Sequence, residues 1–252
     1  MISLLDSSAF SHAKEIGRVN EDAILPPQLL GGGYLMAIAD GVGSYTGADQ
    51  ASRTAINYIR EIQSHDWITG ISSESIFSEI KRRISDLSIQ DQNISDAATT
   101  LTFCYVNPHG IRIGHIGDCR AYIRIGMSLK QLTVDHTQHQ RLMDEGLYRA
   151  HELKLLGGKN TLFSAISKKL ELHYQDLWLP HSDLELHNSE IEIVLMSDGA
   201  HKVWDMRPRF AQSTMSDPNK FASSLKKRIN WAGPTDDYSL VSSKFLINKL
   251  MA

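Results

Sequence analysis

Several aspartates stand where short apolar runs of the sequence end. Asp40 follows the run 34–39, Asp198 closely follows the run 191–196, Asp118 follows a β-rich run, and a glycine adjoins each of the three. Carboxylates at the ends of neighbouring strands can converge on one spot while the strands hold them rigid. A confined cluster of like charges stays ionised only with cations among its members. Carboxylate oxygens suit hard octahedral ions such as Mg²⁺ or Mn²⁺, so this placement indicates a divalent metal site.

More acidic residues flank the expected strands. Asp236 and Asp237 precede the last apolar run, and Glu21 and Asp22 lie upstream of the run 34–39. A different interpretation explains each aspartate singly, because Asp-Gly is among the commonest turn dipeptides. Only the repetition at several strand ends favours metal binding over turns. The residues alone leave both interpretations open.

The elements that must position these residues follow from hydrophobic periodicity. Helical spacing covers 47–63 and 76–87, and a third helix is expected at 221–229. Strands are expected at 34–39, 99–106, 111–116, 120–125, 129–132, 191–196 and 239–247. The strands include two predicted antiparallel hairpins, and the helices come in runs. This arrangement predicts an α+β fold with antiparallel sheets. No change of composition marks a linker, so residues 1–252 are expected to form a single domain.

Composition excludes several functional classes. The chain has 252 residues, of which 42% are hydrophobic and 22% charged, as in ordinary globular proteins. The net charge is −3, so the chain lacks the excess of basic residues that is typical of proteins that bind nucleic acid or an anionic membrane. We expect no signal peptide and no membrane span, because the first residues lack a basic region and no apolar run nears the necessary length. Two cysteines, Cys104 and Cys119, form no disulfide framework, which favours a reducing cytoplasm.

An ordered set of short motifs runs through nearly the whole chain, from about residue 17 to 245. The motifs are RVNED (18–22), ADGVG (39–43), ATT (98–100), GHIGDCRAY (114–122), LTVDHT (132–137), SDG (197–199) and TDDYS (235–239). Together they resemble the metal-dependent Ser/Thr protein phosphatases of the protein phosphatase 2C type, of the bacterial kind. The resemblance implies a four-layer αββα sandwich, two antiparallel sheets flanked by helices.

The resemblance also implies a binuclear Mn²⁺ or Mg²⁺ centre. Asp40 would bridge the two ions, and Gly41 would lend its backbone carbonyl. Asp198 and Asp236 match further ligands. The remaining acidic residues match positions around the two ions: Glu21 and Asp22 would hold metal-bound waters, and Asp118 would hold a third ion together with Asp198.

Four positions depart from the family pattern. Arg18, the candidate phosphate clamp, stands three residues before Glu21, whereas the family's arginine often stands four before. Lys202 replaces an aspartate that serves the third metal in many members, and an ammonium there disfavours a third ion. Val42 replaces a histidine proposed as a general acid in eukaryotic members. Asp237 replaces the usual asparagine.

The implied activity is hydrolysis of phosphoserine and phosphothreonine in proteins by a metal-bridging hydroxide, since two metals can orient a water and neutralise a phosphoryl group. The implied partners are a phosphorylated protein substrate and a Ser/Thr kinase that acts on the same targets. The segment from about 145 to 169 lies where the family has a variable flap, and we expect it to set substrate selectivity. Two alternatives remain: a pseudophosphatase that binds phosphoproteins without turnover, and a phosphatase for small phosphometabolites.

Overall fold

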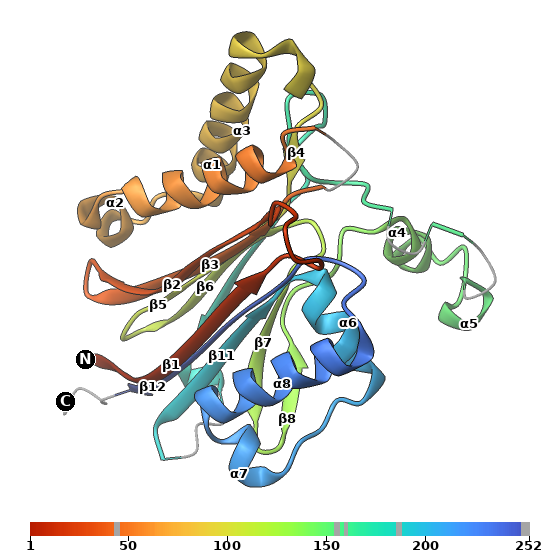
Figure 1. Cartoon of the computed structure of the whole chain (residues 1–252). Coiled ribbons are helices and arrows are strands. Elements are labelled where there is room, and N and C mark those ends of the chain that lie inside the picture. The colour runs from red at the N-terminus through yellow and green to blue at the C-terminus, as the bar shows by residue number, and fades with distance from the viewer. Residues whose placement is uncertain (43–45, 154–156, 159–160, 185–187, 248–252) are drawn as a thin grey trace.

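Two five-stranded antiparallel sheets form the centre of the molecule (Figure 1). The computed structural model describes residues 1–42, 46–153, 157–158, 161–184 and 188–247. The first sheet has the order β1 (Ile2–His12), β12 (Tyr238–Ile247), β11 (Glu190–Met196), β7 (Arg120–Ile125), β8 (Ser128–Gln131). The second has the order β10 (Gln175–Pro180), β6 (Gly110–Ile116), β5 (Leu101–Val106), β3 (Gly33–Asp40), β2 (Asp22–Leu30). A short pair joins β4 (Ala98–Thr99) to β9 (Ile166–Ser167).

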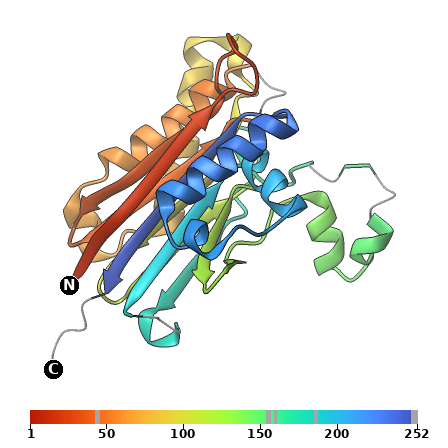
Figure 2. The same cartoon turned by 60° about the horizontal axis from the view of Figure 1, so that its bottom comes forward.

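Helices cover the outer face of each sheet (Figures 1 and 2). The second sheet carries α1 (Ala48–Glu61), α2 (Ser64–Thr69) and α3 (Ser73–Gln90), and the first carries α6 (Asp198–Met206), α7 (Gln212–Met215) and α8 (Pro218–Ala232). In α1, Ala51, Ala55 and Ile59 recur at helical spacing and are fully buried against the sheet.

The main core lies between the two sheets. Met36 and Cys104 of the second sheet belong to the same buried cluster as Ile193, Val241 and Phe245 of the first. Both sheets are therefore buried on two faces, which explains their nearly continuous apolar runs. The layers are helix, sheet, sheet and helix, which confirms the predicted fold class.

The expected hairpins are present, but four strands, β1, β2, β9 and β10, were not expected. β5 pairs with β6 and β7 with β8, both antiparallel. Two of the unexpected strands, β1 and β2, precede the first predicted strand, and the other two, β9 and β10, lie between the predicted strands 129–132 and 191–196. β2 contains Pro26 and Pro27, where its pairing with β3 shifts register. Proline cannot donate to a ladder and is confined to edges and bulges, so this strand is hidden from periodicity. In β1, polar residues interrupt the apolar alternation.

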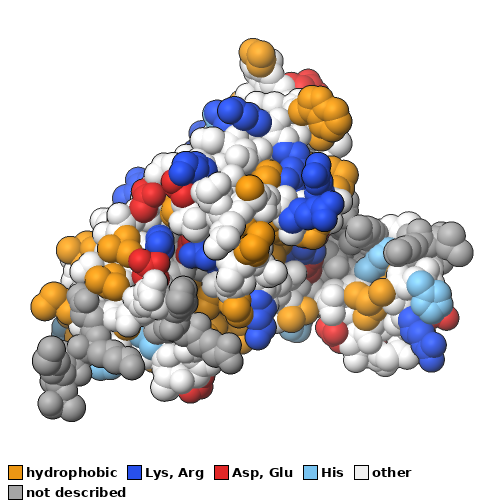
Figure 3. Space-filling model, turned by 90° about the horizontal axis from the view of Figure 1, so that it is seen from below, with side chains coloured by type: hydrophobic (Ala, Val, Ile, Leu, Met, Phe, Trp, Pro, Cys, Tyr) orange, Lys and Arg blue, Asp and Glu red, His pale blue; other side chains and the backbone are white. Residues whose placement is uncertain are grey.

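Between β8 and β9 the chain forms a lobe that stands clear of the sandwich, built on α4 (Gln138–Asp144) and α5 (Ala150–Leu153) (Figures 1 and 2). Figure 3 shows the lobe apart from the body, with hydrophobic side chains on its surface. Leu147 and Tyr148 are both exposed. Parts of the expected flap, 154–156 and 159–160, lie outside the described residues. No helix in the described part of the chain is long and apolar enough to cross a membrane.

Candidate metal centre

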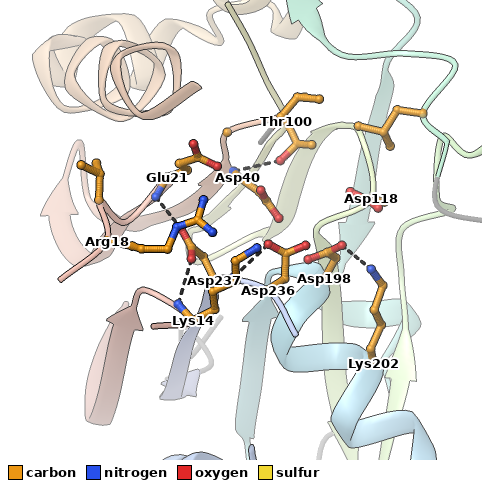
Figure 4. Close-up of a pocket in the computed structure, with 14 residues that line it drawn as sticks. Lys14, Arg18, Glu21, Asp40, Thr100, Asp118, Asp198, Lys202, Asp236 and Asp237 are labelled. Carbon is orange, nitrogen blue, oxygen red and sulfur yellow. Dashed lines mark hydrogen bonds and ion pairs between the residues drawn. The ribbon is translucent and has the colours of Figure 1, made fainter. Parts of the chain in front are cut away.

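Five of the aspartates named from the sequence, Asp237 among them, line one cavity of about 250 Å³ (Figure 4). Asp40 ends β3 and Asp118 follows β6. Asp198 is the first residue of α6, and Asp236 lies just before β12. Glu21 and Gly41 line the same cavity. Elements of both sheets therefore supply the site, as strand-end placement predicts.

The backbone around Asp40 is held from two sides. Its N–H donates to Thr100 Oγ1 at 3.0 Å, and its carbonyl accepts from the Thr100 N–H at 2.8 Å. The Gly41 N–H donates to the Glu21 carbonyl at 3.1 Å. The Thr99 hydroxyl donates to the Asp40 carbonyl at 2.9 Å. The threonines of the third motif thus fix the position from which the Asp40 carboxylate enters the cavity.

Asp22 does not line the cavity but pairs with Asp40 in the β2–β3 register. Its Oδ2 accepts from the Ser197 hydroxyl at 2.8 Å, and Ser197 Oγ in turn accepts from the Ser239 N–H at 2.9 Å. The other oxygen, Oδ1, is buried and has no hydrogen-bond partner. Burial raises the pKa of Asp22 to about 7. Asp22 therefore carries an unsatisfied acceptor next to the main carboxylates.

The carboxylates resist ionising together. Burial, followed by repulsion from Asp22 and Asp198, raises the pKa of Asp40 well above its ordinary value. Burial and the Asp198 charge raise the pKa of Asp118 to about 7 and also raise that of Asp236. The pKa of Glu21 is raised by burial and by Asp237. A cation among these groups would relieve the repulsion, because an opposite charge favours the ionised form.

The donor set fits a divalent cation in its chemistry. The ligand candidates are carboxylates, and Asp198 Oδ1 is buried without a partner. As the side chains stand, no group of three or more His, Cys, Asp or Glu among the described residues could hold an ion. The carboxylates would thus have to draw together around a cation.

Basic side chains also line the cavity. Arg18 is exposed in the loop between β1 and β2, and Lys14 comes from the same loop (Figure 4). On the other side, the Lys202 ammonium forms an ion pair with Asp198 Oδ2. The pKa of Lys202 is raised: burial opposes its charge, but attraction to Asp198 and Asp118 outweighs this cost.

Sequence reasoning missed the role of Asp237. Its Oδ1 accepts from the Lys14 N–H at 2.9 Å, and its Oδ2 accepts from the Glu21 N–H at 2.6 Å. Both oxygens therefore fasten the loop that carries Arg18. Lys14 itself was not singled out, since a lone lysine in a loop gives no sequence signal.

Comparison with known proteins gives consistent results. The family described as Protein phosphatase 2C matches residues 11–246. The serine/threonine phosphatase stp of Listeria welshimeri is 22% identical over 172 residues, which is 66% of this chain and 66% of that protein. The matched region thus covers just under two thirds of this curated relative.

Two solved structures share the fold. A bacterial serine phosphatase superposes with a TM-score of 0.79 at 15% identity, covering 98% of this chain and 100% of the other. The catalytic domain of the serine/threonine protein phosphatase PstP, solved in complex with two manganese ions, has a TM-score of 0.71 at 21% identity, with coverages of 98% and 100%. With the family match over almost the whole sequence, these findings show that the chain belongs to the protein phosphatase 2C family.

Proposed function

We propose that this chain hydrolyses phosphoserine and phosphothreonine in proteins with the help of two Mn²⁺ or Mg²⁺ ions. The observation that carries the proposal is the cavity in which Asp40, Asp198 and Asp236 converge, with Arg18 at its rim. Acidic groups that could hold cations thus lie beside a basic group that could hold phosphate. Membership of the family and the Ser/Thr phosphatase names of its relatives support the same activity.

Each residue has a proposed part. Asp40, Asp198 and Asp236 would hold the two ions with the carbonyl of Gly41, and Glu21 and Asp22 would orient the water molecules around them. Two manganese ions in the PstP structure support this number. When bound, such ions lower the pKa of water and neutralise phosphoryl oxygens. A third ion at Asp118 is disfavoured by Lys202, whose ammonium already pairs with Asp198.

Arg18 would bind the phosphoryl group of the substrate. A guanidinium presents paired donors that match two phosphate oxygens. Asp237 fastens the loop on both sides of Arg18, through the N–H groups of residues 14 and 21. The backbone of this loop is therefore fixed relative to the carboxylates. The exposed side chain can reach a phosphate presented on a protein surface.

Selectivity among substrates would come from the flap segment, about 145–169. It follows α4 in the projecting lobe, and Leu162 within it lines the cavity. A projecting segment that reaches the site can contact residues on either side of a phosphorylated one. The expected partners are phosphorylated proteins and, through them, the Ser/Thr kinase that modifies them. Both cysteines are free and buried, as a cytoplasmic location would require.

The test is hydrolysis of an aryl phosphate and of a phosphothreonine peptide with Mn²⁺, with Mg²⁺ and with excess chelator. Asp40→Ala is compared with Asp86→Ala, a control at a half-exposed ion pair on α3. We expect metal-dependent turnover that only Asp40→Ala abolishes. Turnover that persists in chelator would refute the proposal.

A pseudophosphatase is the second candidate, and the Lys202–Asp198 ion pair favours it, because an ammonium occupies a carboxylate that the metals need. Metal binding without turnover of either substrate would support this binding module over the enzyme.

A further inference from the structure

Lys202 and Asp198 are paired by the geometry of α6. They lie four residues apart on the helix, with the acid nearer its N-terminus, the more favourable order for such a pair. The Lys202 side chain is 32% exposed and that of Asp198 only 12%. The ammonium therefore reaches from the cavity rim to a nearly buried carboxylate.

Lys202 is already bound to one of the carboxylates of the cavity, Asp198. Among the described residues, three basic side chains line the cavity, namely Lys14, Arg18 and Lys202, and of these Lys202 is the one in an ion pair. Its charge also attracts Asp118 and Asp236. One ammonium thus partly compensates three carboxylates that come from three different segments of the chain.

A divalent cation at Asp198 would have to share this carboxylate with Lys202. The free oxygen, Oδ1, is buried without a partner, while Oδ2 is held by the ammonium. Two cations on one carboxylate repel each other, and in a partly buried site this repulsion is weakly screened. Metal and ammonium should therefore compete.

We propose that Lys202 is a tethered counter-ion of the acidic centre, which stabilises the metal-free protein and weakens the binding of divalent cations at Asp198 and Asp118. This inference rests on the proposed function only in taking these carboxylates as metal ligands. The Lys202 ammonium would then compete with the metal ions inside the protein, so that occupancy of the centre depends on the free metal concentration.

The test uses the whole chain, stripped of metal, with Lys202→Met. Mn²⁺ binding is measured by calorimetry, and thermal unfolding is followed in chelator and in saturating Mn²⁺. We expect Lys202→Met to bind Mn²⁺ at least about tenfold more tightly, a change of roughly 1.4 kcal/mol. In chelator its Tm should fall by about 5 °C or more, since removing one partner leaves a buried charge unpaired. Saturating Mn²⁺ should abolish this deficit.

Two controls isolate the charge. Lys202→Arg keeps the cation and should stay near the wild type in both measurements. Lys220→Met removes a lysine from an exposed pair with Asp217 on α8 and should change neither. If Lys202→Met does not fold without metal, Lys202→Gln is measured in its place. Equal or weaker Mn²⁺ binding by the neutral variant, or an unchanged Tm in chelator, would overturn the inference.

Turnover of the aryl phosphate is recorded separately on the wild type. If the wild type hydrolyses no aryl phosphate but Lys202→Met binds Mn²⁺ more tightly than the wild type, the proposed phosphatase activity is refuted and the counter-ion role of Lys202 is supported. Normal metal-dependent turnover with unchanged affinity in Lys202→Met refutes only the counter-ion role.

Discussion

Gly199 is the point where α6 touches the loop that carries Asp236, and Gly199→Ala should separate them. A β-carbon built at Gly199 lies 2.2 Å from the carbonyl oxygen of Asp237 and 3.2 Å from that of Asp236. Ordinary contacts begin at 3.4 Å. Helix and loop must therefore move apart by about 1 Å, which shifts Asp236 relative to Asp198.

The expected cost is both energetic and catalytic. Overpacking of this size lowers the free energy of unfolding by about 1–3 kcal/mol. In a chain of this length, each kcal/mol lost lowers Tm by roughly 2–4 °C. A displacement of about 1 Å can reduce turnover by roughly 100-fold. Both quantities are measured on purified protein, by thermal unfolding with Mn²⁺ and by aryl phosphate hydrolysis.

Gly157→Ala is the matched control, because a β-carbon there meets nothing within 4 Å. We expect it to keep wild-type turnover of the aryl phosphate, a substrate without the flanking residues that the flap segment would contact. The reasoning fails if Gly199→Ala retains wild-type Tm and turnover, for the contact between α6 and the Asp236 loop would then not position the carboxylates.

Three further predictions concern pH, phosphate binding and selectivity. Asp22 and Asp118 have a folded-state pKa of about 7 against an ordinary 3.8, so the folded chain holds protons that the unfolded chain releases. The Tm in chelator should consequently fall as pH rises from about 4 to about 7, and a rising Tm over that window would contradict this. Arg18→Gln should raise KM for the phosphopeptide at least about tenfold, because the variant loses a charge-assisted hydrogen bond to the phosphate. Its Mn²⁺ affinity in calorimetry should stay unchanged, and an unaltered KM would exclude Arg18 as the phosphate clamp. Replacing the flap segment 145–169 by that of a relative should change preference among phosphopeptides more than metal affinity, and the reverse result would refute its role in selectivity.

The convergence of Asp40, Asp198 and Asp236 was predictable because each follows or precedes a strand with a clear apolar pattern. Ends of neighbouring strands can bring such residues to one spot, and the ordered motifs of the family favoured that outcome over isolated turns. The sequence also predicts Lys202 as a departure from the family. Its ion pair requires α6, a helix of nine residues that begins at Asp198 directly after the N-cap residue Ser197 and that periodicity did not indicate.

Other parts of the site depend on contacts between distant segments. Asp22 lies opposite Asp40 only because β2 pairs with β3, and the prolines at 26 and 27 conceal that strand. Asp237 binds the N–H groups of residues 14 and 21, which lie 223 and 216 positions away in the sequence. No local pattern can predict a hydrogen bond of this range, because it depends on how the whole sandwich closes.

The pairing of β1 with β12 has a consequence for synthesis of the protein on the ribosome. β12 lies between β1 and β11, so β1 has no neighbour in its sheet until β12 exists. From His12 to Tyr238 the ribosome must add 226 residues (238 − 12). At roughly 5–20 residues per second this takes about 10–45 s. Throughout that time β1 is an open strand of a nascent chain, the kind of surface that chaperones protect, and the edge of β11 that β12 will cover joins it once Met196 has been added. The acidic cavity, which needs Asp236, is among the last features to form.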